Sequence, residues 1–63
     1  MDTLTVFEKE VMDLVTQGLS NKEIAAKLGV SHRKVHDCFN GILNKVGIAT
    51  RLEAVAWYRH EYQ

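Results

Sequence analysis

The sequence has no proline, one cysteine, no net charge and no long apolar run, and each of these absences excludes a class of protein. The longest unbroken apolar segment, residues 54–58, is far shorter than the ~20 residues of a membrane span. No basic segment followed by an apolar one opens the chain, so no secretory signal is expected. The single thiol, Cys38, cannot close an internal disulfide and is interpreted as a half-buried small apolar residue. We therefore expect a cytoplasmic protein without membrane contact.

The length of 63 residues is near the lower limit for one apolar core and predicts a single domain over residues 1–63. A composition of 46% hydrophobic and 25% charged residues is typical of a globular protein and argues against disorder. Such a small domain leaves little room for a catalytic cleft. No nucleophile, base and orienting group occur at a catalytic spacing, and no phosphate-binding glycine loop is present. Neither an enzyme nor a cofactor is expected.

The zero net charge hides an uneven distribution along the chain. Residues 1–21 carry a net charge of minus three, residues 22–51 carry plus four, and residues 52–63 carry minus one. A neutral protein can therefore present one basic face, and the affinity for a polyanion follows the local potential rather than the total.

Helix start and stop signals recur regularly and predict an all-α bundle. Thr5 with Glu8, Ser20 with Glu23, and Thr50 with Glu53 each fit the capping box, in which a hydroxyl and a carboxylate satisfy free backbone N–H groups. Ser31 is a fourth N-cap candidate, and glycines follow the first three segments. These signals predict four helices, at about 6–17, 21–28, 32–46 and 51–61.

Apolar residues at helical spacing predict which side of each helix faces the core. On the third helix the inward stripe is Val35, Phe39, Ile42 and Val46. On the fourth helix the expected inward residues are Leu52, Val55 and Ala56, with Tyr58 or Trp57 as additions.

The second and third predicted helices, joined by a tight turn at residues 29–30, have the arrangement of a helix-turn-helix. Opposite the apolar stripe, the third helix presents Arg33, Asp37, Asn40 and Asn44, with Lys34 on one border and His36 on the other. Arginine can fork onto guanine, asparagine can pair with adenine, aspartate can accept from cytosine, and lysine attracts phosphate. We assign Lys34 and Asn44 to phosphates and Arg33 to a base. The same row also fits the solvated face of a protein-interaction bundle.

Three blocks resemble the LuxR-type helix-turn-helix domain, also called the GerE or FixJ type: LTVFEKEVMDLVTQGLSNKEIAAKLGVS, ILNKVGI and TRLEAV. The resemblance covers nearly the whole chain and implies a four-helix, double-stranded-DNA-binding domain of a bacterial-type transcription regulator. It implies that the third helix lies in the major groove, with base contacts from His36, Asp37 and Asn40. It also implies phosphate contacts from Ser20, Asn21, Lys22, Ser31 and Lys45. The free N–H groups and positive dipole at helix starts favour such phosphate contacts.

Four residues depart from the family pattern. Phe7 stands where arginine is frequent, Lys34 where threonine is usual, His36 where lysine is usual, and Cys38 where histidine is frequent. The histidine removes a permanent charge, and Asp37 adds a negative charge near phosphates, so weaker binding is expected at neutral pH.

The resemblance also implies dimerisation through the fourth helix, for which Trp57, Tyr58 and Tyr62 are the candidate contacts, although these aromatics fit core packing equally well. Members of the family usually carry a regulatory domain, so such a domain or a partner regulator is expected. His32 and His36 have a spacing that can hold a metal, but no second ligand pair accompanies them, and we expect no metal site. The alternative function is a helix-turn-helix used for protein association, with weak or no DNA binding.

Overall fold

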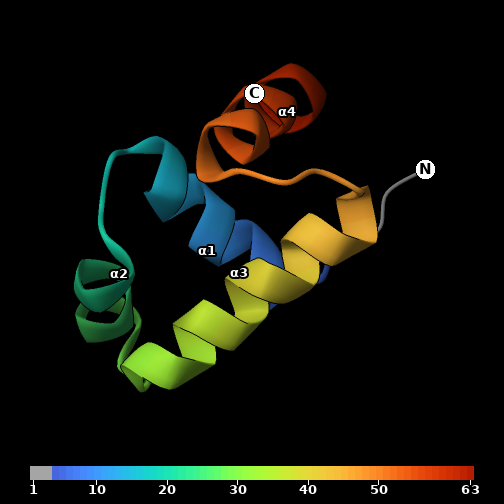
Figure 1. Cartoon of the computed structure of the whole chain (residues 1–63). Helices are drawn as coiled ribbons and strands as arrows, with labels where there is room; N and C mark the ends of the chain where they lie inside the picture. Colours follow the sequence, from blue (N-terminus) through green and yellow to red (C-terminus); the bar gives the residue numbers. More distant parts are fainter. Residues whose placement is uncertain (1–3) are drawn as a thin grey trace.

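The computed structural model describes residues 4–63, and their helices confirm the predicted all-α bundle (Figure 1). The helices are α1 (Val6–Thr16), α2 (Asn21–Leu28), α3 (His32–Val46) and α4 (Arg51–Tyr62). Helix α1 ends one residue earlier than expected, and α4 continues one residue further. The described residues contain no strand. None of the helices within residues 4–63 has the length and apolar character needed to cross a membrane.

All four predicted N-caps are formed. In α2 the Ser20 N–H donates to Glu23 Oε1 at 2.8 Å, and the Glu23 N–H donates to Ser20 Oγ at 3.2 Å. The capping boxes of α1 and α4 have the same reciprocal form. Ser31 caps α3 by accepting from the Lys34 N–H at 3.0 Å. Because these caps replace lost backbone hydrogen bonds, the sequence defines where each helix begins.

Helix α1 lies centrally and packs against each of the other three helices (Figure 1). All the buried side chains within residues 4–63 are apolar or aromatic. The predicted inward stripe of α3 is confirmed, since Val35 and Ile42 are fully buried and Phe39 is nearly so. The core is made of Leu4, Val11, Met12, Leu14, Val15, Ile24, Ala25, Val35, Phe39, Ile42, Ala54 and Tyr58.

The predicted inward side of α4 is wrong at Leu52 and Ala56, whereas Tyr58, named as a possible addition, is buried. Leu52 is 79% exposed and Ala56 is also exposed, whereas Ala54 and Tyr58 are the buried residues of this helix. Apolar residues occupy 52 and 54–58 and therefore surround the helix, so their spacing favours no single side. In the structure Tyr58 packs against α1, where its hydroxyl contacts Lys9 and Asp13. This contact between distant residues cannot be predicted from the spacing of apolar residues within α4.

Candidate nucleic-acid interface

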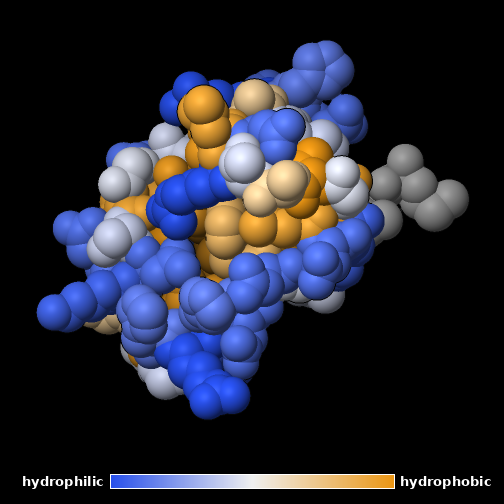
Figure 2. Space-filling view, viewed as in Figure 1, coloured by the Kyte–Doolittle hydropathy of each residue, from blue (hydrophilic) through white to orange (hydrophobic). Residues whose placement is uncertain are grey.

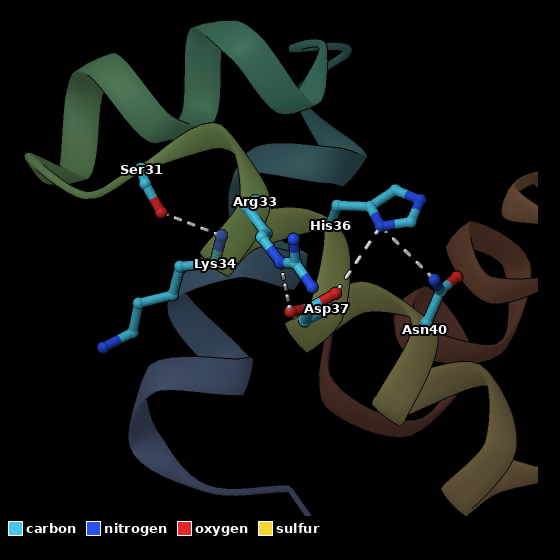
Figure 3. Close-up of polar contacts among 6 residues, drawn as sticks. All are labelled: Ser31, Arg33, Lys34, His36, Asp37 and Asn40. Carbon is cyan, nitrogen blue, oxygen red and sulfur yellow. Dashed lines mark hydrogen bonds and ion pairs between the residues drawn. The ribbon is translucent and has the colours of Figure 1, made fainter.

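Helices α2 and α3 form the helix-turn-helix, and they pack directly against each other. The turn between them begins at Gly29, whose φ of 71° is in the left-handed region that favours glycine. Ser31 then caps α3, so the reversal of the chain is short (Figure 3). The local sequence therefore places the start of α3 beside α2, with the first turn of α3 open to solvent.

The four candidate base-contacting residues all project from the exposed side of α3 (Figure 3). The side chains of Arg33, Asp37 and His36 are 86%, 65% and 58% exposed. Arg33 Nε lies 3.7 Å from Asp37 Oδ2, and His36 Nδ1 lies 3.7 Å from Asp37 Oδ1. Asn40 Nδ2 lies 3.5 Å from His36 Nδ1. Exposed contacts of this kind contribute little stability, so the same groups can exchange them for contacts with bases.

The surface around this row is hydrophilic. In Figure 2 hydrophilic side chains cover the lower part of the molecule, where α2 and the first half of α3 lie in Figure 1. Apolar surface gathers above α3, toward α4. In this view the exposed surface of the helix-turn-helix is thus predominantly hydrophilic.

At the start of α2, the predicted phosphate-contacting residues have different surroundings. Ser20 and Lys22 are both exposed. The Ser20 side chain is engaged in the capping box, and Lys22 supplies a positive charge. Asn21 is half-buried, and its Oδ1 accepts from Arg51 Nη1 at 3.1 Å. The side-chain oxygen of Asn21 therefore contacts Arg51 of α4 instead of facing the solvent.

Arg51 is a residue whose role sequence reasoning missed. Besides Asn21, its guanidinium donates from Nη2 to the Leu19 carbonyl oxygen and lies 5.4 Å from the centre of the Phe39 ring. These contacts join the start of α4 to the loop before α2 and to the core side of α3. This arginine is part of the TRLEAV block, next to the Thr50 cap. The sequence there predicts the start of a helix, but not the contacts of the arginine with distant residues.

Lys45, predicted to lie at a phosphate, forms an ion pair with Glu8. Its Nζ lies 2.7 Å from Glu8 Oε1, and the lysine and glutamate side chains are 34% and 14% exposed. Burial raises the pKa of Glu8, but the hydrogen bonds from Lys45 and from the Thr5 backbone N–H outweigh it, and the net pKa is lowered. The carboxylate is therefore charged at neutral pH and offsets the lysine charge. Asn44, the other candidate in this turn, is exposed.

Cys38 lies half-buried on the border of α3 between Lys34 and Lys45. Burial, followed by the negative charge of Glu8, raises the pKa of its thiol. The thiol is thus kept in its neutral form, in agreement with its interpretation as a small apolar residue.

Tyr58, one of the predicted dimer contacts, is buried within the single chain. It is 3% exposed, its hydroxyl donates to Asp13 Oδ1 at 2.8 Å, and its ring stacks on Tyr62 with centroids 4.7 Å apart. Burial and the Asp13 hydrogen bond raise the pKa of this hydroxyl. Tyr58 therefore belongs to the core of the single chain. Trp57 and Tyr62 are partly buried against the same core.

Residues 2–58 match the family described as bacterial regulatory proteins, luxR family. Among similar proteins, response regulator Rre1 of Synechocystis sp. is 48% identical over 48 residues, which are 76% of this chain and 21% of that protein. The nitrate/nitrite response regulator protein NarL of Escherichia coli is 33% identical over 61 residues, which are 97% of this chain and 28% of that protein. An HTH-type transcriptional regulator of Mycobacterium bovis is 43% identical over 53 residues, 84% of this chain and 6% of that protein.

A similar fold occurs in the crystal structure of response regulator ChrA from a heme-sensing two-component system. The TM-score is 0.89 at 33% identity, with 97% of this chain and 30% of that chain covered. The chain spans less than a third of each of these proteins. The matches establish a DNA-binding domain used in transcription regulation, and not an enzyme. The chain belongs to the LuxR family of bacterial regulatory proteins.

Proposed function

We propose that this domain binds double-stranded DNA in a sequence-specific manner, with α3 in the major groove. The observation that carries the proposal is the exposed row of Arg33, His36, Asp37 and Asn40 on the side of α3 that faces away from the core. A major groove admits one α-helix, and only groups on its outward side reach base edges. The row offers donors and acceptors at successive turns of that side.

Each member of the row has a chemical partner among the bases. Arg33 can donate two hydrogen bonds to guanine, Asn40 can pair with adenine, and Asp37 can accept from the amino group of cytosine. His36 can donate or accept, depending on its tautomer and protonation. The weak contacts within the row hold these groups close together without burying them.

Phosphate contacts are proposed around the two helix starts. Lys22 and Lys34 supply charge, and Ser20 and Ser31 mark where free N–H groups of α2 and α3 are exposed. Asn44 and Lys45 extend this set toward the end of α3, although the Glu8 carboxylate reduces the contribution of Lys45.

Dimerisation through α4 is proposed as well, with a contact surface different from the expected one. Leu52 and Ala56 are exposed and Val55 is half-buried, and their spacing places them on one side of α4. Trp57 and Tyr62 can extend this surface, because each keeps exposed area. Two copies joined in this way would bind the two halves of an inverted repeat.

The chain is proposed to act in the cytoplasm under the control of a regulatory domain or a partner regulator. The support is that two of the similar proteins are named response regulators and are more than three times as long as their matched segments. A signal received elsewhere in such a regulator would then control whether this domain reaches DNA.

Salt dependence tests the proposal for DNA. Lys22 and Lys34, with a reduced contribution from Lys45, would release about two counterions, so log Kd should rise with log salt with a slope of about 2 per copy. Fluorescence anisotropy of a labelled duplex, titrated with the protein between low and moderate salt, measures this slope. A slope near zero would contradict phosphate contact by these residues.

The alternative function is protein association without DNA, supported by the exposed apolar residues of α4 and by the negative charge of Asp37 in the α3 row. It predicts that the chain self-associates in sedimentation experiments while a duplex causes no change in its sedimentation. Co-sedimentation with the duplex favours the DNA-binding function.

A further inference from the structure

Two departures from the family pattern meet in space. Phe7 is in the first turn of α1 and Lys34 is in the first turn of α3, 27 positions along the chain. The Lys34 ammonium lies 5.1 Å from the centre of the Phe7 ring, within the range of a cation–π contact. The positive charge that the family frequently has on α1 is thus replaced by a ring, and a positive charge on α3 lies over that ring.

The residue after Phe7 contacts the other lysine on the same border of α3. Glu8 forms its 2.7 Å ion pair with Lys45, and Lys34 and Lys45 are separated by three helical turns. Adjacent residues of α1 therefore contact both lysines of this border. The two contacts differ in charge, because a carboxylate offsets a positive charge and a neutral ring does not.

This difference has a consequence for the binding of a polyanion. The neutral Phe7 ring does not offset the charge of Lys34, which stays exposed, and a cation–π contact favours those positions of the flexible side chain that lie over the ring. A lysine that is already ordered loses less side-chain entropy when it binds a phosphate. Lys45 must give up or share Glu8 before it can make the same contact.

We propose that Lys34 is the principal phosphate-contacting lysine on this border of α3 and that Phe7 is its positioning residue. The inference rests on the proposed function and goes beyond it by ranking the two lysines and by giving Phe7 a role in DNA binding. Phe7 is half-buried, so its ring also packs on the core, and the experiment must separate these two roles.

The experiment compares variants of the 63-residue chain by anisotropy titration of a labelled duplex at several salt concentrations. Lys34→Gln should lower the salt slope by about 0.9, the value for one phosphate contact, whereas Lys45→Gln should lower it by less than half as much. Phe7→Leu keeps an apolar side chain and removes the ring, and should weaken binding by about 2- to 5-fold. Phe7→Tyr retains a ring and should bind the duplex as tightly as the unmodified domain.

A double variant shows whether Phe7 acts through Lys34. If it does, Phe7→Leu combined with Lys34→Gln binds no more weakly than Lys34→Gln alone, because the ring has no ammonium left to position. A purely structural role would instead weaken binding in both backgrounds. Circular dichroism confirms that each variant is folded. Should Phe7→Leu unfold the domain, the salt slopes of the two lysine variants still test the ranking of the lysines. The affinity of Phe7→Tyr still tests the role of the ring.

Several outcomes would overturn the inference. Equal or tighter binding by folded Phe7→Leu would show that the ring does not help Lys34. Equal slope changes in the two lysine variants would remove the ranking. These results leave the proposed function intact if the unmodified domain binds DNA with a steep salt dependence. A lack of salt-dependent binding by the unmodified domain would refute the proposed function, and the inference with it.

Discussion

Replacement of Arg51 by alanine should cause a large loss of stability. Its guanidinium donates to the Leu19 carbonyl oxygen and to Asn21 Oδ1, and it lies over the Phe39 ring. A hydrogen bond involving a charged group contributes about 1.5–3 kcal/mol, and a cation–π contact about 0.5–1 kcal/mol. The contacts share one side chain and are partly exposed, so we expect a combined loss of about 2–3 kcal/mol rather than their sum.

For a domain of this size, whose total stability is roughly 3–5 kcal/mol, such a loss would leave about 0–3 kcal/mol, so roughly 1% to 50% of the molecules would be unfolded at room temperature. The expected decrease in Tm is about 8–16 °C for a loss of about 2 kcal/mol. Urea unfolding followed by far-ultraviolet circular dichroism measures the change in free energy of unfolding, and a thermal scan measures the Tm.

Arg59→Ala is a matched control. Arg59 is on the same helix and is exposed, with Nη2 donating to the Thr16 carbonyl oxygen at 3.2 Å. Because this contact is exposed to solvent, its loss should lower stability by less than about 1 kcal/mol. Arg51→Lys, which keeps the charge but loses the planar fork, should fall between the two alanine variants. A loss in Arg51→Ala no larger than that in Arg59→Ala would refute the claim that Arg51 joins α4 to the helix-turn-helix.

Three further predictions concern the core, the α1–α3 ion pair and the α3 row. Tyr58→Phe removes the hydroxyl that donates to Asp13 and should lower the free energy of unfolding by about 1 kcal/mol in urea, so an unchanged midpoint would contradict the hydrogen bond. The lowered pKa of Glu8 means that its stabilising effect is present above the ordinary carboxyl pKa of 4.5 and is lost as the pH falls through the lower folded value. Urea midpoints should therefore decrease less toward acid pH in Glu8→Gln than in the unmodified chain, and parallel pH profiles would show that Glu8 is not responsible. Asp37→Asn removes a negative charge near phosphates and should tighten binding to duplexes of random sequence while changing the preference at one base pair. If competition titrations show the affinity and the preference unchanged, Asp37 is not part of the interface.

The helix positions could be predicted because their signals are local. Each capping box uses residues three apart, and the structure forms all three of them, together with the Ser31 cap of α3. The inward stripe of α3 was also predictable, since its apolar residues are on one side and polar residues occupy the other. These features need no knowledge of distant parts of the chain.

The orientation of α4 could not be predicted in this way. Its apolar residues surround the helix, and the buried side contains Ala54 and Tyr58, whose hydroxyl reaches Asp13, 45 positions earlier in the chain. The same applies to Arg51 and Asn21, which are 30 positions apart. Contacts between distant residues depend on the packed arrangement of the helices, which the spacing within one helix does not contain.

For the candidate site, sequence reasoning identified side chains but not their partners. The exposed positions of Arg33, His36, Asp37 and Asn40 followed from helical projection alone. The ion pair of Lys45 with Glu8 and the placement of Lys34 over Phe7 did not, because both depend on how α1 crosses α3. The charges available to DNA are therefore determined by tertiary contacts as well as by composition.

The central claim is that the exposed side of α3 and the neighbouring helix starts contact DNA. Titration of an isotope-labelled sample with a short duplex, followed by backbone amide chemical shifts, tests it most directly. The account predicts that the largest changes fall in residues 31–45 and at the start of α2. Changes confined to residues 50–62, or no changes at low salt, would contradict it.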